Sequence, residues 1–146
     1  MDGSLNIAVL TVSDTRTAAN DTSGDYLCEA LAKAGHTLAE RRIVIDDVYQ
    51  MRAAVSQWIA DAAVKVILLT GGTGFTTRDS TPEAVRPLLD TEVTGFGELF
   101  RQLSYAEIGT STVQSRALAG IANGTMVFCM PVSTGACKTA WTGILR

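Results

Sequence analysis

Residues 64–83 read VKVILLTGGTGFTTRDSTPE and join an apolar run to a loop rich in glycine and hydroxyl side chains. The run from Val64 to Leu69 consists almost entirely of Val, Ile and Leu, which is typical of a strand buried on both faces. Pro82 fits the first turn of a helix extending to about Leu89, because proline there loses no intrahelical hydrogen bond. The stretch therefore predicts a strand, loop and helix of an α/β protein.

The preceding segments repeat this alternation of strands and helices. Strands are predicted at residues 5–12 and 37–45, and helices at residues 23–35 and 48–62, where apolar residues recur at helical spacing. Strands that alternate with helices form a parallel sheet with crossover helices.

The carboxyl-terminal third predicts a change of strand direction. Asn123-Gly124 separates two apolar runs within residues 117–131, and this pair readily adopts the positive φ values of a tight hairpin turn. Short helices are predicted around residues 98–103 and 112–116, and a last helix begins at residue 135. The expected sheet is therefore mostly parallel with one antiparallel hairpin.

Length and composition exclude several classes of protein. A chain of 146 residues, 47% hydrophobic and 18% charged, is expected to fold as one domain over residues 1–146. A net charge of -3 without a basic run argues against nucleic acid as a partner. No secretory signal or membrane span is recognisable, so we expect a soluble, cytoplasmic protein. Cys28, Cys129 and Cys137 fit neither a disulfide framework nor a C-x-x-C metal site.

Three polar loops follow predicted strands, at residues 11–24, 70–83 and 130–138. In open α/β sheets, ligands bind beyond the carboxyl ends of the strands, where such loops lie. The second loop contains glycines that permit close backbone approach and a threonine hydroxyl, which suits a phosphate or another polar anion. It is neither a Walker A motif nor a G-x-G-x-x-G fingerprint, and a purely structural turn is the alternative.

Carboxylates flank this glycine loop. Asp79 precedes the helix that begins near Pro82, where it could cap backbone N–H groups or hold a hard cation. Asp46 and Asp47 end the second strand, so at least one carboxylate is expected at the same edge of the sheet. Two carboxylates near an anion loop suggest Mg²⁺ bridging a phosphorylated substrate, and a pair of solvated loop acids is the alternative.

His36 is the single histidine and lies far from the glycine loop in sequence. Ser-His-Asp and Cys-His mechanisms need an imidazole beside the nucleophile, so they are disfavoured. Phosphoryl or nucleotidyl transfer with a phosphate as nucleophile needs no histidine. Four loop cations could neutralise phosphate charge or remain solvated on the surface: Arg16, Arg78, Arg116 and Lys138.

The stretches IAVLTVSD, NDTSG, LTGGTGFTTRDSTPEAV, GFGELFRQLS, IGTSTVQSRALAG and MPVSTGACKTAW together resemble the MoaB/MogA family of molybdenum-cofactor biosynthesis proteins over essentially the whole chain, and more closely its MoaB branch. The resemblance implies a three-layer α/β/α domain that forms homo-oligomers, either trimers or hexamers. It also implies molybdopterin adenylyltransferase activity: with Mg²⁺, the molybdopterin phosphate attacks the α-phosphate of ATP, giving adenylyl-molybdopterin and pyrophosphate.

The same resemblance implies roles for individual residues. Asp79 and Asp46 correspond to the family's functional carboxylates, which would serve catalysis and hold the metal, and Asp47 is the alternative to Asp46. The implied substrate-binding residues come from three loops: Ser13, Asp14, Gly71, Gly72, Thr73, Gly74 and Ser133.

Two departures from the family pattern bear on these roles. Val132 replaces the usual glycine after Pro131, and a β-branched residue is costly where the backbone needs positive φ or must touch a ligand. The chain also ends at Arg146 within a predicted helix, whereas MoaB relatives continue, so a C-terminal helix or tail is either lacking or dispensable. The alternatives to an active transferase are a non-catalytic molybdopterin carrier or assembly protein and a purely structural oligomer.

Overall fold

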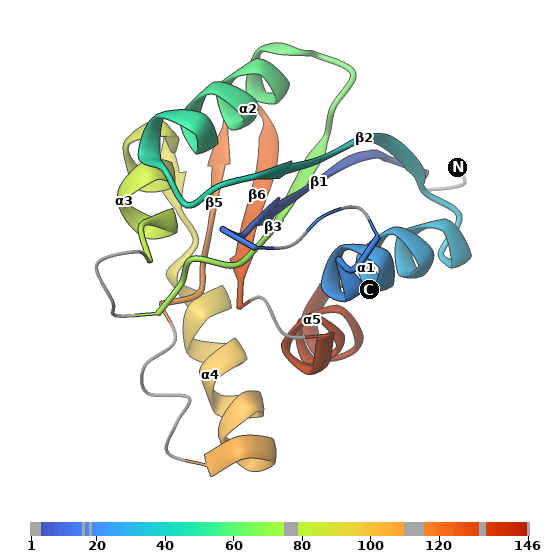
Figure 1. The fold of residues 1–146 in the computed structure, drawn as a ribbon, viewed down its shortest axis with the longest axis vertical. Coiled ribbons are helices and arrows are strands. Elements are labelled where there is room, and N and C mark those ends of the chain that lie inside the picture. Colours follow the sequence, from blue (N-terminus) through green and yellow to red (C-terminus); the bar gives the residue numbers. More distant parts are fainter. Residues whose placement is uncertain are drawn as a thin grey trace.

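The computed structural model describes residues 4–15, 17, 19–74, 79–109, 116–131 and 134–145. In these residues, six strands form one sheet in the order β2-β1-β3-β6-β5-β4 (Figure 1). The strands are β1 (Asn6–Val12), β2 (Thr37–Val44), β3 (Val66–Thr70), β4 (Thr91–Glu92), β5 (Leu118–Ala122) and β6 (Thr125–Met130). The helices are α1 (Thr22–Lys33), α2 (Val48–Ala60), α3 (Thr81–Val85), α4 (Thr94–Ile108) and α5 (Thr134–Ala140). A 3₁₀ turn follows α3 at Arg86–Leu88, and a π-helical turn follows α5 at Trp141–Leu145.

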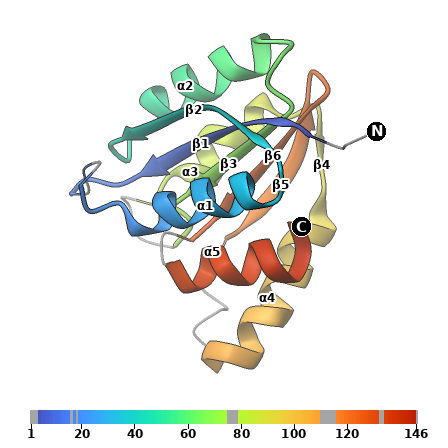
Figure 2. The ribbon, with the colours of Figure 1, turned by 90° about the vertical axis from the view of Figure 1, so that its right-hand side faces the viewer.

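Helices cover both faces of the sheet, as Figure 2 shows, with α2 and α3 on one side and α1, α4 and α5 on the other. Alternate residues of β1 point to opposite faces: Ile7 and Val9 pack in the core beneath α1, whereas Ala8 and Leu10 pack in the core beneath α2. The predicted α/β/α sandwich is confirmed.

Strand directions also agree with the prediction. The four strands β2, β1, β3 and β6 are parallel, and β5 and β4 run antiparallel to their neighbours. Asn123 and Gly124 form the turn of the β5–β6 hairpin with φ values of 52° and 79°.

Between α3 and β5, the structure contains more regular secondary structure than the sequence pattern predicted. The helix predicted at residues 98–103 spans Thr94–Ile108, and the short strand β4 was missed. Two glycines weaken the helical pattern at the start of α4, but Phe96 and Phe100 are buried there, so packing offsets propensity. Of the helix predicted at residues 112–116, residues 112–115 lie outside the described part, and Arg116 is not helical.

The chain changes direction across the sheet between β1 and β3. From β1 it passes through α1 to β2 on one side, and it returns through α2 to β3 on the other side of β1. The loops after β1 and β3 therefore leave at a topological switch point, where open α/β sheets form their ligand crevice. Among the described residues, none of the helices is long and apolar enough to cross a bilayer.

A buried aspartate secures the loop between β1 and α1. Asp21 caps α1 by accepting a hydrogen bond from Gly24 N at 3.0 Å, and it also accepts one from Thr11 Oγ1 at 2.6 Å. Arg41 of β2 contributes an ion pair at 3.0 Å. Burial by itself would raise the pKa of Asp21, but the hydrogen bonds from Thr11, Gly24 and Arg41 outweigh it and lower that pKa below the ordinary value of 3.8.

We predict that Asp21→Asn lowers the free energy of unfolding by about 1–3 kcal/mol near neutral pH, because buried partners lose a charged acceptor. A carboxylate whose pKa is lowered by folding stabilises the fold above its ordinary pKa, and this contribution disappears as pH falls through the lowered value. The difference between parent and variant, measured by urea denaturation, should therefore shrink below pH 3.8.

Asp25 provides the matched control for this prediction. It pairs with the same guanidinium at 2.8 Å, but its side chain is 48% exposed. Asp25→Asn should cost less than about 1 kcal/mol, as exposed ion pairs usually do. Equal losses from the two variants would contradict the structural role assigned to Asp21.

Candidate functional site

The glycine loop after β3 lies against the ends of the neighbouring strands. Gly71 has φ of +112°, and a Cβ atom there would overlap the carbonyl oxygen of Val12 at the end of β1. Its N–H donates to Met130 O at the end of β6 over 2.8 Å. Gly72 also has positive φ, +68°. The sequence therefore needs glycine at these positions to seat the loop at the switch point.

Asp46 is held beside this loop by groups from two other segments. Its Oδ1 accepts a hydrogen bond from Ser80 N at 3.1 Å and another from Ser80 Oγ. Its backbone N–H donates to Asp14 Oδ1 over 3.0 Å. The second oxygen, Oδ2, faces Gly72, since a Cβ atom on that glycine would lie 3.1 Å from it. Asp46 is only 8% exposed, and its carboxylate is oriented toward the glycine loop.

The adjacent Asp47 has a different task. It is the N-cap residue of α2, and its carboxylate accepts hydrogen bonds from Tyr49 N at 2.7 Å and Gln50 N at 3.2 Å. The geometry therefore favours Asp46 over Asp47 as the carboxylate of the candidate site.

Asp79 lies on the other side of the loop. A Cβ atom on Gly74 would be 2.7 Å from its Oδ2, so glycine leaves room for this carboxylate. The N-cap residue of α3 is Ser80, one position after Asp79. Asp46 and Asp79 thus approach the same loop at Gly72 and Gly74.

This donor set fits a hard cation. Mg²⁺ prefers oxygen ligands and is commonly held by one or two carboxylates together with substrate phosphates and water. The described residues contain no cluster of three or more His, Cys, Asp and Glu side chains suited to a metal. Asp46 and Asp79 would therefore supply part of a coordination shell that a phosphorylated substrate completes.

Other predicted residues are distributed as follows. The N–H of Ser13 continues the β1–β2 pairing by donating to Val44 O at 2.9 Å, which places Asp14 next to Asp46. Thr73 is buried within the loop. His36 accepts a hydrogen bond from Leu5 N, at the opposite end of β1. Lys138 is exposed on α5, whereas Arg16, Arg78, Val132 and Ser133 lie outside the described residues.

Sequence reasoning missed how Arg116 is used. Its Nε donates to Gly74 O at 2.7 Å, its Nη2 donates to Asp79 O at 2.6 Å, and its guanidinium also pairs with the carboxylate of Glu83. Its backbone N–H donates to Thr73 O over 2.7 Å. Arg116 therefore holds the loop rather than presenting a cation to solvent.

The sequence carried one signal for the segment that Arg116 holds. Ser80 and Glu83 have the spacing of a helix capping box. In the structure both side chains are diverted: Ser80 Oγ donates to Asp46, and Glu83 pairs with Arg116. The pattern is typical of a helix start, but it does not indicate that Ser80 and Glu83 contact Asp46 and Arg116.

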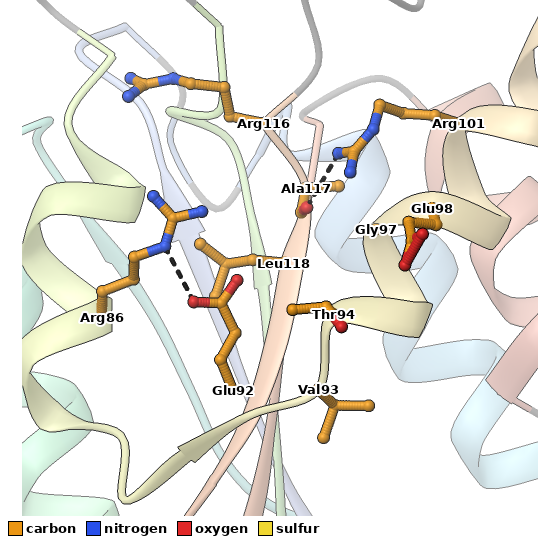
Figure 3. A pocket seen from close by; sticks show the side chains of 10 residues that line it. All are labelled: Arg86, Glu92, Val93, Thr94, Gly97, Glu98, Arg101, Arg116, Ala117 and Leu118. Carbon is orange, nitrogen blue, oxygen red and sulfur yellow. Dashed lines mark hydrogen bonds and ion pairs between the residues drawn. The ribbon is translucent and has the colours of Figure 1, made fainter.

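An open depression of about 350 Å³ adjoins Arg116 on the side of β4 and α4 (Figure 3). Arg86 Nε pairs with Glu92 at 3.1 Å, and Arg101 Nη1 donates to Ala117 O at 3.2 Å. The lining carries three arginines and two glutamates, so the opposite charges partly offset one another.

We predict that Gly72→Ala lowers the free energy of unfolding by about 1–3 kcal/mol, because alanine is strained at positive φ. Its Cβ atom would also overlap Thr81 Oγ1, which donates to Gly71 O over 2.8 Å. Gly95→Ala is the control, since a Cβ atom there meets nothing within 4 Å. If chemical denaturation finds equal stability for both variants, the geometry described for the loop is wrong.

Comparisons with known proteins identify the family of this chain. Residues 8–146 match the family model described as "Probable molybdopterin binding domain". The chain is 56% identical over 139 residues to Molybdenum cofactor biosynthesis protein B of Escherichia coli K12, covering 95% of this chain and 82% of that protein. It is 48% identical to the protein of the same name from Halalkalibacterium halodurans, covering 94% of this chain and 81% of that protein.

Solved structures give the same assignment. A crystal structure of Molybdenum cofactor biosynthesis protein B superimposes with a TM-score of 0.95 and 44% identity, covering 99% of this chain and 91% of that one. The tungsten cofactor synthesizing protein MoaB from Pyrococcus furiosus superimposes with a TM-score of 0.87 and 38% identity, covering 97% of this chain and 91% of that one. The chain therefore belongs to the MoaB/MogA family of molybdopterin-binding domains.

Proposed function

We propose that this protein is a Mg²⁺-dependent molybdopterin adenylyltransferase acting in molybdenum-cofactor biosynthesis. A phosphate oxygen of molybdopterin bonds to the α-phosphorus of ATP, the bond from that phosphorus to the β-bridging oxygen breaks, and pyrophosphate leaves. The observation that carries this proposal is that Asp46 and Asp79 both face one glycine loop at the switch point. Membership of a molybdopterin-binding family and the names of its relatives support the substrate. A reaction that consumes ATP accords with the cytoplasmic location expected from the sequence.

The residues of the site would act mainly by positioning. Gly72 and Gly74 carry no side chain, so the carboxylates of Asp46 and Asp79 can lie close to the loop backbone. Asp46 is already oriented by Ser80, so little reorganisation is needed when substrates bind. Mg²⁺, when bound by Asp46 and Asp79, would neutralise phosphate charge. The nucleophile is already anionic, so the reaction requires no histidine.

We predict that Asp79→Asn and Asp46→Asn each reduce formation of adenylyl-molybdopterin by at least about 100-fold, because each removes a carboxylate from the proposed metal site. Purified protein would be incubated with molybdopterin, ATP and Mg²⁺, and the product would be measured by chromatography.

Asp47→Asn is the matched control. Asparagine caps helices about as well as aspartate, so this variant should keep the fold and the activity. Undiminished product from Asp46→Asn and Asp79→Asn would contradict the assigned roles. If the parent forms no product but still binds molybdopterin, the protein is a carrier.

We also propose that the protein forms a homo-oligomer, a trimer or a hexamer, as the family resemblance implies. Figures 1 and 2 both show the distal end of α4 extending away from the sheet. Tyr105 and Ile108 lie there, 57% and 59% exposed. Large apolar side chains at a projecting helix end are suited to contacts between subunits.

We predict that the double variant Tyr105→Glu, Ile108→Glu dissociates to smaller species in light scattering, because burying new charges at an interface is costly. Tyr49→Glu is the control, since Tyr49 is 77% exposed on α2 at another face. Unchanged mass for the double variant would place the subunit contacts elsewhere.

A further inference from the structure

We propose that Arg116 is a positioning residue that fixes the Asp79 carboxylate relative to the glycine loop. The inference rests on the proposed function for the role of Asp79, but the contacts that support it do not. Arg116 side-chain nitrogens donate to the carbonyls of Gly74 and Asp79, at 2.7 and 2.6 Å. One guanidinium therefore links Gly74, in the glycine loop, to Asp79, which carries the carboxylate.

The bond to the Asp79 carbonyl restrains the backbone that carries the carboxylate. The carbonyl carbon is attached to the same Cα as the side chain, so holding its oxygen limits rotation of the peptide unit and movement of the Cα from which the carboxylate extends. The other end of the same peptide unit is also held, because the N–H of Ser80 donates to Asp46 Oδ1 over 3.1 Å. Ser80 Oγ donates to the same oxygen, so the position of Asp79 relative to Asp46 depends on the bond from Arg116 and on both bonds from Ser80.

Arginine is required for this arrangement because it serves several acceptors at once. A guanidinium has five N–H donors in a rigid plane, whereas a lysine ammonium has three on a flexible stem. Here the acceptors are two backbone carbonyls and the carboxylate of Glu83, whose oxygens accept from Nη1 and Nη2. That pairing lowers the pKa of Glu83 below its ordinary value. Lysine would keep the charge of Arg116 but could not satisfy all three groups.

A second arginine in the same depression provides a matched control. Figure 3 shows Arg86 beside Glu92, to which its Nε donates over 3.1 Å. This pair also joins an arginine on one element to a glutamate on another, but Glu92 belongs to β4 and not to the glycine loop. Any general effect of replacing an arginine in this depression should appear at both positions.

The test compares Arg116→Lys, Arg86→Lys and Glu83→Gln in steady-state kinetics with molybdopterin, ATP and Mg²⁺. Arg116→Lys should lower kcat by about 10- to 100-fold with little change in KM for ATP, because a small displacement of a catalytic group is costly. Arg86→Lys should match the parent. Glu83→Gln should lower kcat only a few-fold, since the bonds to Gly74 and Asp79 remain possible. Tm is measured for each variant, so that loss of folded protein is recognised.

Two results would overturn the inference. These are parent-like kcat in Arg116→Lys and an equal loss of kcat in Arg86→Lys. If Arg116→Lys does not fold, Glu83→Gln decides, and parent-like kcat there overturns the inference.

Hydrogen exchange separates this inference from the proposed function. If the parent forms no product, the adenylyltransferase proposal fails. Amide exchange without substrates still tests the clamp, meaning the hydrogen bonds from Arg116 to the carbonyls of Gly74 and Asp79. The N–H groups of Ser80 and Thr81 donate to Asp46 and Gly72 and should exchange at least about 10-fold faster in Arg116→Lys than in Arg86→Lys. Equal exchange in the two variants would overturn the positioning role.

Discussion

The approach of Gly71 to the carbonyl of Val12 is the constraint on which the site depends. A side chain at Gly71 would collide with the end of β1, so the loop after β3 can cross there only with glycine. The same residue is bonded to the end of β6, which seats the loop between two parallel strands. Because its start is fixed in this way, Gly72 and Gly74 come to face Asp46 and Asp79. The backbone geometry of Gly71 therefore helps to place the loop between the two carboxylates.

The neighbouring residues Asp46 and Asp47 have different roles: Asp47 caps a helix, whereas Asp46 faces the glycine loop. Asp47 satisfies backbone N–H groups at the start of α2, which orients the turn that carries Asp46. Asp46 uses one oxygen for Ser80 and turns the other toward the loop. Ser80 thereby gives up the side-chain cap that α3 would otherwise have, and Pro82 reduces the cost because it has no N–H to satisfy. Helix capping and site assembly are therefore linked through one short segment.

The sequence predicted the features that depend on local pattern. The apolar runs gave the central strands, Asn123-Gly124 gave the hairpin, and the motifs of the glycine loop indicated the family. It did not predict the full length of α4, since burial of Phe96 and Phe100 is a tertiary effect. It also left Asp46 and Asp47 as alternatives, because adjacent residues at a strand end are separated only by what each one contacts.

Charge balance supports the proposal that a divalent cation takes part. Arg41, Arg86 and Arg116 all form ion pairs with acidic side chains in the described structure. Each of these three guanidinium groups already has an acidic partner, and Asp46 and Asp79 place two further carboxylates where phosphates would approach. Two phosphorylated substrates would increase the repulsion further, at an energy that grows as the site loses water. A cation shared by the carboxylates and the phosphates would convert that repulsion into attraction, and the clamp on Asp79 would then determine where the cation lies.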